Sequence, residues 1–196
     1  MSDDKIFEQE KVYTYADVMK LPEQMRCERI DGVLYNMTPA PSPRHQEIVT
    51  QLSYEFVTYF RKTKKCKVFV SPIDVCLSAN CSDPAKITEW VQPDLVVVCD
   101  KQKLDEQKIT GTPDLIAEVL SPSTAKKDRK IKFCRYEKAL IPQYWIIDPV
   151  HESVEVYVLK ENEYKLKQVY FKDDVIKVDF FDGLEIDLGN IFGKEQ

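Results

Sequence analysis

The sequence predicts an α/β fold in which helices flank a central mixed β-sheet, with extra antiparallel hairpins toward the C-terminus. Apolar residues recur at helical spacing in two segments, 43–62 and 123–139, and short runs rich in β-branched and aromatic residues precede and follow the second. At 196 residues and 43% hydrophobic content, the chain can bury one sizeable core. We therefore treat residues 1–196 as a single domain.

The N-terminal part predicts a short helix followed by a hairpin. Thr14 and Asp17 form a capping pair that opens the helix, and Pro22 closes it. The segment CERIDGVLYNM then reads as a hairpin with Asp31-Gly32 at its turn.

The clearest helix spans about residues 43–62. Ser42 is its predicted cap and Pro43 its first residue. One face carries the apolar stripe, namely Ile48, Leu52, Phe56, Tyr59 and Phe60.

Strands and a second helix follow. The predicted strands are KVFVS (67–71), IDVCLS (73–78), DLVVVC (94–99) and DLIAEVL (114–120). The second helix runs from Ser123 or Thr124 to about Ala139, with Ser123 as its cap. The remaining strands are QYWIID (143–148), SVEVYVL, EYKLKQVYF and a final pair around DDVIKV and GLEIDL. We expect Tyr144 and Trp145 to lie in the core.

The bulk features predict a cytoplasmic protein that does not enter a membrane. No run reaches the roughly 18 apolar residues of a membrane span, and the acidic N-terminus has no apolar signal segment. Six scattered cysteines without a secretion signal predict reduced thiols. Paired ligands at zinc-binding spacing are absent from the sequence.

A net charge of −5 argues against strong non-specific binding to a polyanion, but not against a local basic surface. The first of two basic clusters, for which we expect a solvated charged face, comprises Arg61, Lys62, Lys64, Lys65 and Lys67. The second, on the second helix, comprises Lys126, Lys127, Arg129, Lys130, Lys132 and Arg135.

Two acidic residues interrupt apolar strands at places that can meet. Asp94 is the first residue of the predicted strand DLVVVC, and Glu118 lies near the end of the predicted strand DLIAEVL. Antiparallel pairing of these strands would bring the two carboxylates side by side. Period-two alternation places Glu118 on the same face as Ile116 and Leu120, where an unpaired carboxylate would be costly.

A hard cation such as Mg²⁺ would satisfy both acids, because it takes one or two carboxylates and completes its shell with water and substrate phosphate. The metal could then polarise a phosphodiester and activate a water. The alternative is structural: carboxylates at strand ends that bind backbone N–H groups or a lysine.

Taken together, these motifs resemble the Uma2 family of predicted endonucleases, a branch of the PD-(D/E)XK restriction-endonuclease-like superfamily. The resemblance runs nearly end to end. It is carried by YTYADVMKLPE, ERIDGVLYNMTPAPSPRHQ, QPDLVVV, PDLIAEVLSPST, the series Asp128, Lys132 and Tyr136, then QYWIIDP and GLEIDL.

The resemblance implies a restriction-endonuclease-like mixed sheet and metal-dependent cleavage of nucleic acid. It also implies that Asp94 and Glu118 are metal ligands and that Glu28 is a further acid near the site; an exposed hairpin glutamate is the alternative. The motif departs from the family at Leu120, which stands where lysine is expected.

Lys132 is the candidate replacement for that lysine. Asp128, Lys132 and Tyr136 are spaced four apart and form one helical stripe, and Ile131 and Cys134 turn the helix toward the core. Lys132 would orient or deprotonate the attacking water or neutralise phosphate charge. The structural alternative is that Lys132 only forms an intrahelical ion pair with Asp128.

Other predicted roles concern substrate contacts and further site residues. On the same helix, the predicted substrate-binding residues are Lys126, Lys127, Lys130 and Tyr136. His45, in the first turn of the long helix, could bind a phosphate or a catalytic carboxylate, or pack without a function. Asp74 could face the same site, but nothing in the sequence decides this.

The functional hypothesis is a Mg²⁺-dependent endonuclease acting on DNA, with Mn²⁺ as a substitute. It lacks a recognition module, so specificity would come from a partner or from a homodimer. A catalytically inactive nuclease-fold domain that binds nucleic acid or protein is the alternative, supported by Leu120 and the acidic charge. A phosphodiesterase acting on RNA or a small substrate is a third.

Overall fold

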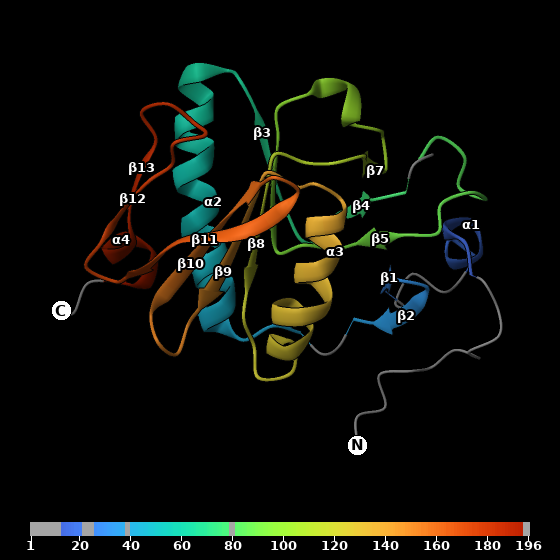
Figure 1. Cartoon of the computed structure of the whole chain (residues 1–196), viewed down its shortest axis with the longest axis horizontal. Coiled ribbons are helices and arrows are strands. Elements are labelled where there is room, and N and C mark those ends of the chain that lie inside the picture. Colours follow the sequence, from blue (N-terminus) through green and yellow to red (C-terminus); the bar gives the residue numbers. More distant parts are fainter. Residues whose placement is uncertain (1–12, 21–25, 38–39, 79–80, 194–196) are drawn as a thin grey trace.

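The computed structural model describes residues 13–20, 26–37, 40–78 and 81–193. Within these ranges, the strands form two mixed sheets and one separate hairpin (Figure 1). The predicted mixed α/β architecture is confirmed. The predicted helix end at Pro22 lies outside the described residues.

The larger sheet has six strands in the order β11-β10-β9-β8-β6-β3. Neighbouring strands are antiparallel except β8 and β9, which are parallel. The strands are β3 (Lys67–Val70), β6 (Leu95–Val98), β8 (Leu115–Val119), β9 (Gln143–Asp148), β10 (Ser153–Lys160) and β11 (Glu163–Phe171). All six match predicted strands, and the C-terminal β10–β11 hairpin is among the extra hairpins expected.

The smaller sheet was not foreseen as a separate unit. It has five strands in the order β2-β1-β5-β4-β7: β1 (Cys27–Ile30), β2 (Val33–Asn36), β4 (Asp74–Cys76), β5 (Trp90–Val91) and β7 (Lys108–Thr110). Pro72 follows β3 and has no N–H to donate, so the chain leaves the larger sheet there and resumes in the smaller one. A third unit pairs β12 (Val175–Lys177) with β13 (Glu185–Asp187).

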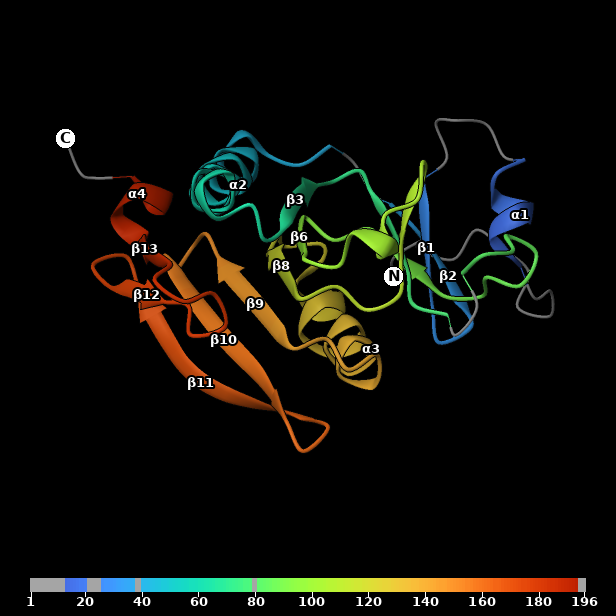
Figure 2. The ribbon, with the colours of Figure 1, turned by 90° about the horizontal axis from the view of Figure 1, so that it is seen from above.

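Two helices cover opposite faces of the larger sheet (Figure 2). Helix α2 (Pro43–Thr63) buries Ile48, Leu52 and Phe56 against the face that carries Leu115, Ala117 and Val119. Helix α3 (Phe133–Lys138), which continues the π-helical segment η2 (Lys127–Lys132), packs on the face of Ile116 and Leu120. The alternation predicted for β8 is therefore confirmed.

The shorter helices lie toward the two ends of the molecule. The predicted capping box of Thr14 and Asp17 opens α1 (Tyr15–Val18). The 3₁₀ turn η1 (Lys101–Lys103) follows β6, and α4 (Leu188–Phe192) packs against α2 near the C-terminus. Within the described ranges, no helix is long and apolar enough to cross a membrane.

Two expectations about local structure were wrong. The cap of the second helical segment is Ser121 rather than Ser123, because the Ser121 hydroxyl accepts a hydrogen bond from the Thr124 amide at 3.2 Å. The cysteines are not all reduced: disulfides join Cys66 to Cys99 and Cys76 to Cys81. Residues scattered along the sequence meet in the fold, which spacing alone does not reveal.

Candidate functional site

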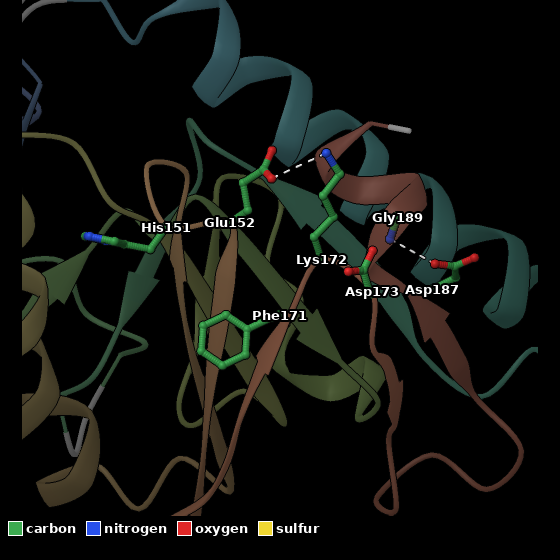
Figure 3. Close-up of a pocket in the computed structure, with 7 residues that line it drawn as sticks. All are labelled: His151, Glu152, Phe171, Lys172, Asp173, Asp187 and Gly189. Atoms are coloured by element: carbon green, nitrogen blue, oxygen red, sulfur yellow. Dashed lines mark hydrogen bonds and ion pairs between the residues drawn. The ribbon is translucent and has the colours of Figure 1, made fainter. Parts of the chain in front are cut away.

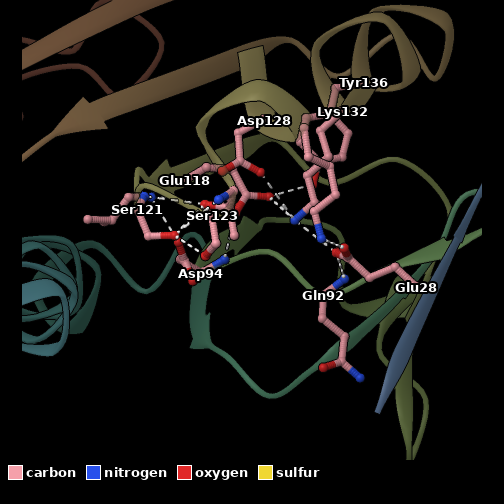
Figure 4. Close-up of polar contacts among 12 residues, drawn as sticks. Glu28, Gln92, Asp94, Glu118, Ser121, Ser123, Asp128, Lys132 and Tyr136 are labelled. Atoms are coloured by element: carbon pink, nitrogen blue, oxygen red, sulfur yellow. Dashed lines mark hydrogen bonds and ion pairs between the residues drawn. The ribbon is translucent and has the colours of Figure 1, made fainter. Parts of the chain in front are cut away.

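Antiparallel pairing of β6 and β8 brings the two predicted carboxylates together. Leu95 lies opposite Ala117, so the preceding residue, Asp94, lies beside Glu118. The Asp94 backbone amide is 3.4 Å from Glu118 Oε2 (Figure 4). The pair therefore forms at the end of the larger sheet where β6 begins and β8 ends.

Glu118 is buried, with 2% of its surface exposed. Its Oε1 accepts hydrogen bonds from Lys132 Nζ at 2.8 Å and from the Tyr136 hydroxyl at 2.6 Å. Burial raises the pKa of Glu118 to about 8 against the opposing effect of Lys132, and the nearby carboxylates add to the rise. Negative charge at this position is therefore incompletely compensated.

Lys132 lies between two glutamates. Its ammonium nitrogen is 2.8 Å from Glu118 Oε1 and 2.8 Å from Glu28 Oε1, and its side chain is 4% exposed. Burial lowers the pKa of Lys132, but the adjacent carboxylates outweigh burial and hold it well above its ordinary value. Lys132 thus remains a cation, and it points toward the carboxylate pair.

Glu28 is fully buried rather than an exposed hairpin residue. Its two oxygens bind the ammonium groups of Lys132 and Lys127, each at 2.8 Å. Burial raises the pKa of Glu28, but the two lysines outweigh burial and lower it to about 2. Because Glu28 is firmly ionised, it suits holding Lys132 in place better than donating a proton.

The helical stripe of Asp128, Lys132 and Tyr136 lies buried on the sheet side, as its spacing predicts. The ion pair of Lys132 with Asp128, at 3.9 Å, is longer than the 2.8 Å contacts of Lys132 with Glu118 and Glu28. Cys134, expected to turn toward the core, is exposed. Its neighbours Ile131 and Phe133 pack against the core in its place.

His45 joins the site from the first turn of α2. The Ser42 hydroxyl accepts the His45 backbone N–H at 3.2 Å, and His45 Nε2 lies 3.1 Å from Asp94 Oδ2. That oxygen also accepts the Val119 amide at 2.8 Å. Burial lowers the pKa of His45, but the contact with Asp94 outweighs it, so the pKa is raised.

The family model described as "Putative restriction endonuclease", Uma2, matches residues 13–189. This chain belongs to the Uma2 family. Two relatives, both from Synechocystis sp. (strain ATCC 27184 / PCC 6803 / Kazusa), are named as uncharacterised proteins. One, sll1609, is 28% identical to this chain over an alignment that covers 75% of this chain and 81% of sll1609. The other, slr1290, is 25% identical over an alignment that covers 69% of this chain and 67% of slr1290.

A crystal structure described as a putative nuclease belonging to DUF820, from Anabaena variabilis ATCC 29413, has the same fold. The superposition has a TM-score of 0.71 and covers 92% of this chain and 97% of that one, at 20% sequence identity. At that identity the likeness concerns the fold alone. The restriction-endonuclease-like fold expected from the sequence is therefore confirmed for this Uma2 chain.

The predicted substrate-binding residues of the Uma2 chain divide into two groups. Lys126 and Lys130 are exposed and free to meet a ligand. Lys127 instead binds Glu28, and Tyr136 is fully buried with its hydroxyl on Glu118. For Tyr136 a direct substrate contact is thus contradicted, because its stripe faces the sheet.

Sequence reasoning missed Gln92 and left Asp74 undecided. The Gln92 backbone amide donates to Glu28 Oε1 at 2.9 Å, and its side chain donates to Asp74 Oδ1 at 2.8 Å. Asp74 also accepts the Tyr15 hydroxyl at 2.5 Å, so it supports the site through Gln92 instead of facing it. The adjacency of Gln92 to the Pro93-Asp94 motif was the available signal.

The two carboxylates are suitable ligands for a hard cation, but the protein does not supply a full set of metal ligands around them within the described residues. Asp94 Oδ1 makes no hydrogen bond within the described residues, and Glu118 Oε2 has only the 3.4 Å contact. In that same part of the chain, no group of three or more His, Cys, Asp or Glu side chains is placed to hold a metal. Mg²⁺, which keeps several waters, needs only one or two carboxylates.

A cavity of about 590 Å³ lies elsewhere, beside the β9–β10 and β11–β12 turns (Figure 3). It contains none of the predicted site residues, and its lining includes Glu152, Lys172 and Asp187. Lys172 pairs with Glu152 at 3.4 Å, while Asp187 binds the Gly189 amide. The side chains of Glu152, Lys172 and Asp187 are thus engaged with the protein itself.

Proposed function

We propose that this Uma2 chain is a Mg²⁺-dependent endonuclease that hydrolyses phosphodiester bonds of DNA, with Mn²⁺ able to replace Mg²⁺. The arrangement of Asp94, Glu118 and Lys132 carries the proposal: two carboxylates lie side by side at a sheet end, and a buried lysine contacts one of them at 2.8 Å. Leu120 stands at the strand position where the family motif has lysine, and in this proposal Lys132, on the neighbouring helical segment, takes the place of that lysine.

Asp94 and Glu118 would hold the cation. The raised pKa of Glu118 supports this assignment, because it arises chiefly from burial and further from Asp128, Asp94 and Glu28, and a cation beside Glu118 would offset both effects. Bound there, Mg²⁺ would polarise a phosphodiester and lower the pKa of an attacking water.

The protein groups around the pair have separate tasks. The Lys132 ammonium would orient the attacking water or neutralise charge developing on the phosphate. Glu28 positions Lys132, and His45 fixes one oxygen of Asp94. Exposed Lys126 and Lys130 would contact the substrate backbone.

The test is cleavage of supercoiled plasmid and of single-stranded DNA with Mg²⁺ or Mn²⁺. We expect Asp94→Asn, Glu118→Gln and Lys132→Gln each to lower the rate by at least about a hundredfold, while Lys160→Gln, exposed at the end of β10, changes it far less. Calorimetric titration with Mn²⁺ should show weaker binding for Asp94→Asn at unchanged melting temperature. Cleavage that survives all three substitutions would refute the assignment.

An inactive nuclease-fold domain that binds nucleic acid or protein is the second candidate. The observation that favours it is the enclosure of Lys132, which is 4% exposed and engaged by two glutamates. This candidate predicts that DNA binding in EDTA is unchanged by Lys132→Gln and that no cleavage occurs with either metal.

A further inference from the structure

Six exposed cations gather at the end of the larger sheet that is remote from the carboxylate pair. None makes an ion pair within the residues that the structure describes. We name this set the basic surface: Arg61, Lys62, Lys64, Lys65, Lys67 and Lys101. The 61–67 cluster is exposed, as the sequence predicts, and the fold adds a sixth charge from a distant segment.

Two connections hold the basic surface together. Helix α2 ends at Thr63, and β3 begins at Lys67 opposite Val98 near the end of β6. The Cys66–Cys99 disulfide joins the same two segments, and Lys101 follows Cys99 after one exposed residue, Asp100, which caps η1. The end of α2 and the turn η1 lie at the same end of the molecule (Figure 1).

The basic surface and the carboxylate pair lie at opposite ends of β6. Asp94 precedes this strand and Cys99 follows it, so about 14 Å of extended chain separates Asp94 from Val98. The basic surface is therefore separate from the carboxylate pair.

Local structure accounts for part of these charges. Arg61 and Lys62 lie in the last turn of α2 and Lys64 is its C-cap, where cations favourably meet the helix dipole. Lys101 lies in the short turn η1, and Lys67 lies on the edge strand β3, where lysine discourages pairing with another chain. Lys65 serves neither purpose.

The chemistry of the basic surface fits a phosphate backbone better than a protein partner. Protein interfaces are depleted of lysine and have an apolar centre. Here five of the six residues are lysines, and none of the exposed large hydrophobic residues of the described chain falls within 61–67 or at 101. The chain's net charge is −5, so the residues outside the basic surface carry a net −11. The positive charge is thus concentrated against an acidic background.

We propose that the basic surface is a second nucleic-acid contact, which binds the sugar–phosphate backbone without reading sequence. It lies outside the carboxylate site and does not require cleavage. Lysines that neutralise phosphates release counterions, so binding should weaken steeply with salt, by about 0.9 in log K per log salt for each phosphate contacted.

The test measures binding of a short fluorescent duplex by anisotropy in EDTA, across a salt series. In the variant Lys62→Gln/Lys64→Gln/Lys65→Gln, we expect affinity to fall roughly tenfold to a hundredfold at about 0.1 M salt and the salt slope to decrease by about 2 to 3. The matched control, with the same loss of charge at exposed sites elsewhere, is Lys86→Gln/Lys160→Gln/Lys177→Gln.

Equal losses in both triple variants, or no duplex binding by the native chain, would overturn the proposal. So would a protein that loses binding through Asp94→Asn/Glu118→Gln but keeps it in the basic-surface variant. Because EDTA prevents metal-dependent cleavage, a native chain that fails to cut plasmid leaves this binding result standing. Circular dichroism confirms that both triple variants remain folded.

Discussion

At the scale of single residues, Lys132 reaches the carboxylate pair from a helix, while Leu120 stands at the strand position where the family motif has lysine. Leu120 lies two residues after Glu118 on the same face of β8, and it packs in the core there. Lys132 reaches the same glutamate from across that face, with Glu28 on its other side. Such buried charges are strongly coupled, because each loses water that only its partners replace.

Replacing Lys132 should therefore destabilise the fold as well as the site. In Lys132→Met we expect a loss of about 3 kcal/mol in the free energy of unfolding, since Glu118 would have to stay protonated and Glu28 would keep only Lys127. Urea titration at neutral pH measures this. Lys130→Met, exposed on the same helix, should change it by less than about 0.5 kcal/mol; similar values for the two variants would contradict the buried ion network.

Glu28 should make stability depend on acidity. Its pKa is lowered from 4.5 to about 2 in the folded chain, so its contribution is fully present above about pH 4.5 and is lost as pH falls toward 2. A shift of this size corresponds to about 3 kcal/mol. Urea unfolding at a series of pH values should show this loss in the native chain.

The matched pair for that measurement is Glu28→Gln and Glu161→Gln. The first substitution should flatten the stability profile between about pH 4.5 and 2, because the shifted carboxyl group is gone. The second alters an exposed turn residue and should keep the native slope. If Glu28→Gln kept the native dependence of unfolding free energy on pH, the acid sensitivity would arise from groups other than Glu28.

At the scale of elements, spacing located most strands and both longer helical segments but missed β5, β7 and α4, and the pairing of β6 with β8 then placed the site. Antiparallel β6 and β8 are what the sequence predicted, because Asp94 and Glu118 stand at opposite ends of their apolar runs. The π-helical turns of η2 were not predictable: they arise where tertiary contacts outweigh the ordinary helical spacing. The buried stripe of Asp128 and Lys132 nevertheless survives this change.

The start of α2 offers a direct test of how an element holds the site. Ser42→Ala removes the hydroxyl that accepts the His45 amide, so we expect the free energy of unfolding to fall by about 1 kcal/mol. The His45 ring resonances should broaden in NMR spectra. Ser53→Ala, in mid-helix, is the control and should have little effect, because its hydroxyl only back-bonds to Thr50. Unchanged stability and spectra in Ser42→Ala would contradict the capping role.

At the scale of the whole molecule, the sequence predicted the carboxylate pair and the mixed α/β class but not how distant segments meet. The burial of Glu28 depends on the smaller sheet packing beside η2, and the hairpin CERIDGVLYNM carries no sign of that contact. The burial of Tyr136 likewise follows from the sheet beneath its helix. The spacing of residues along a helix or strand predicts which side chains share a face. Tertiary packing determines which of those faces are buried.

The Cys66–Cys99 disulfide is a clear case of such long-range contact, and the loop lengths of the two disulfides predict unequal effects. Cys66–Cys99 spans a sequence separation of 33 and Cys76–Cys81 one of 5. Restricting the unfolded chain should therefore stabilise the protein by about 4 kcal/mol for the first and about 2 kcal/mol for the second.

Comparing oxidised and reduced protein in urea separates these contributions. In Cys66→Ala/Cys99→Ala the difference in free energy of unfolding between the two redox states should shrink by about 4 kcal/mol, and in Cys76→Ala/Cys81→Ala by about 2 kcal/mol. Cys134→Ala, which removes an exposed free thiol, should leave the difference unchanged. Both disulfides would be contradicted if mass spectrometry found all six cysteines alkylated without prior reduction. In that case only the pairing of β3 with β6 would hold the two segments of the basic surface together.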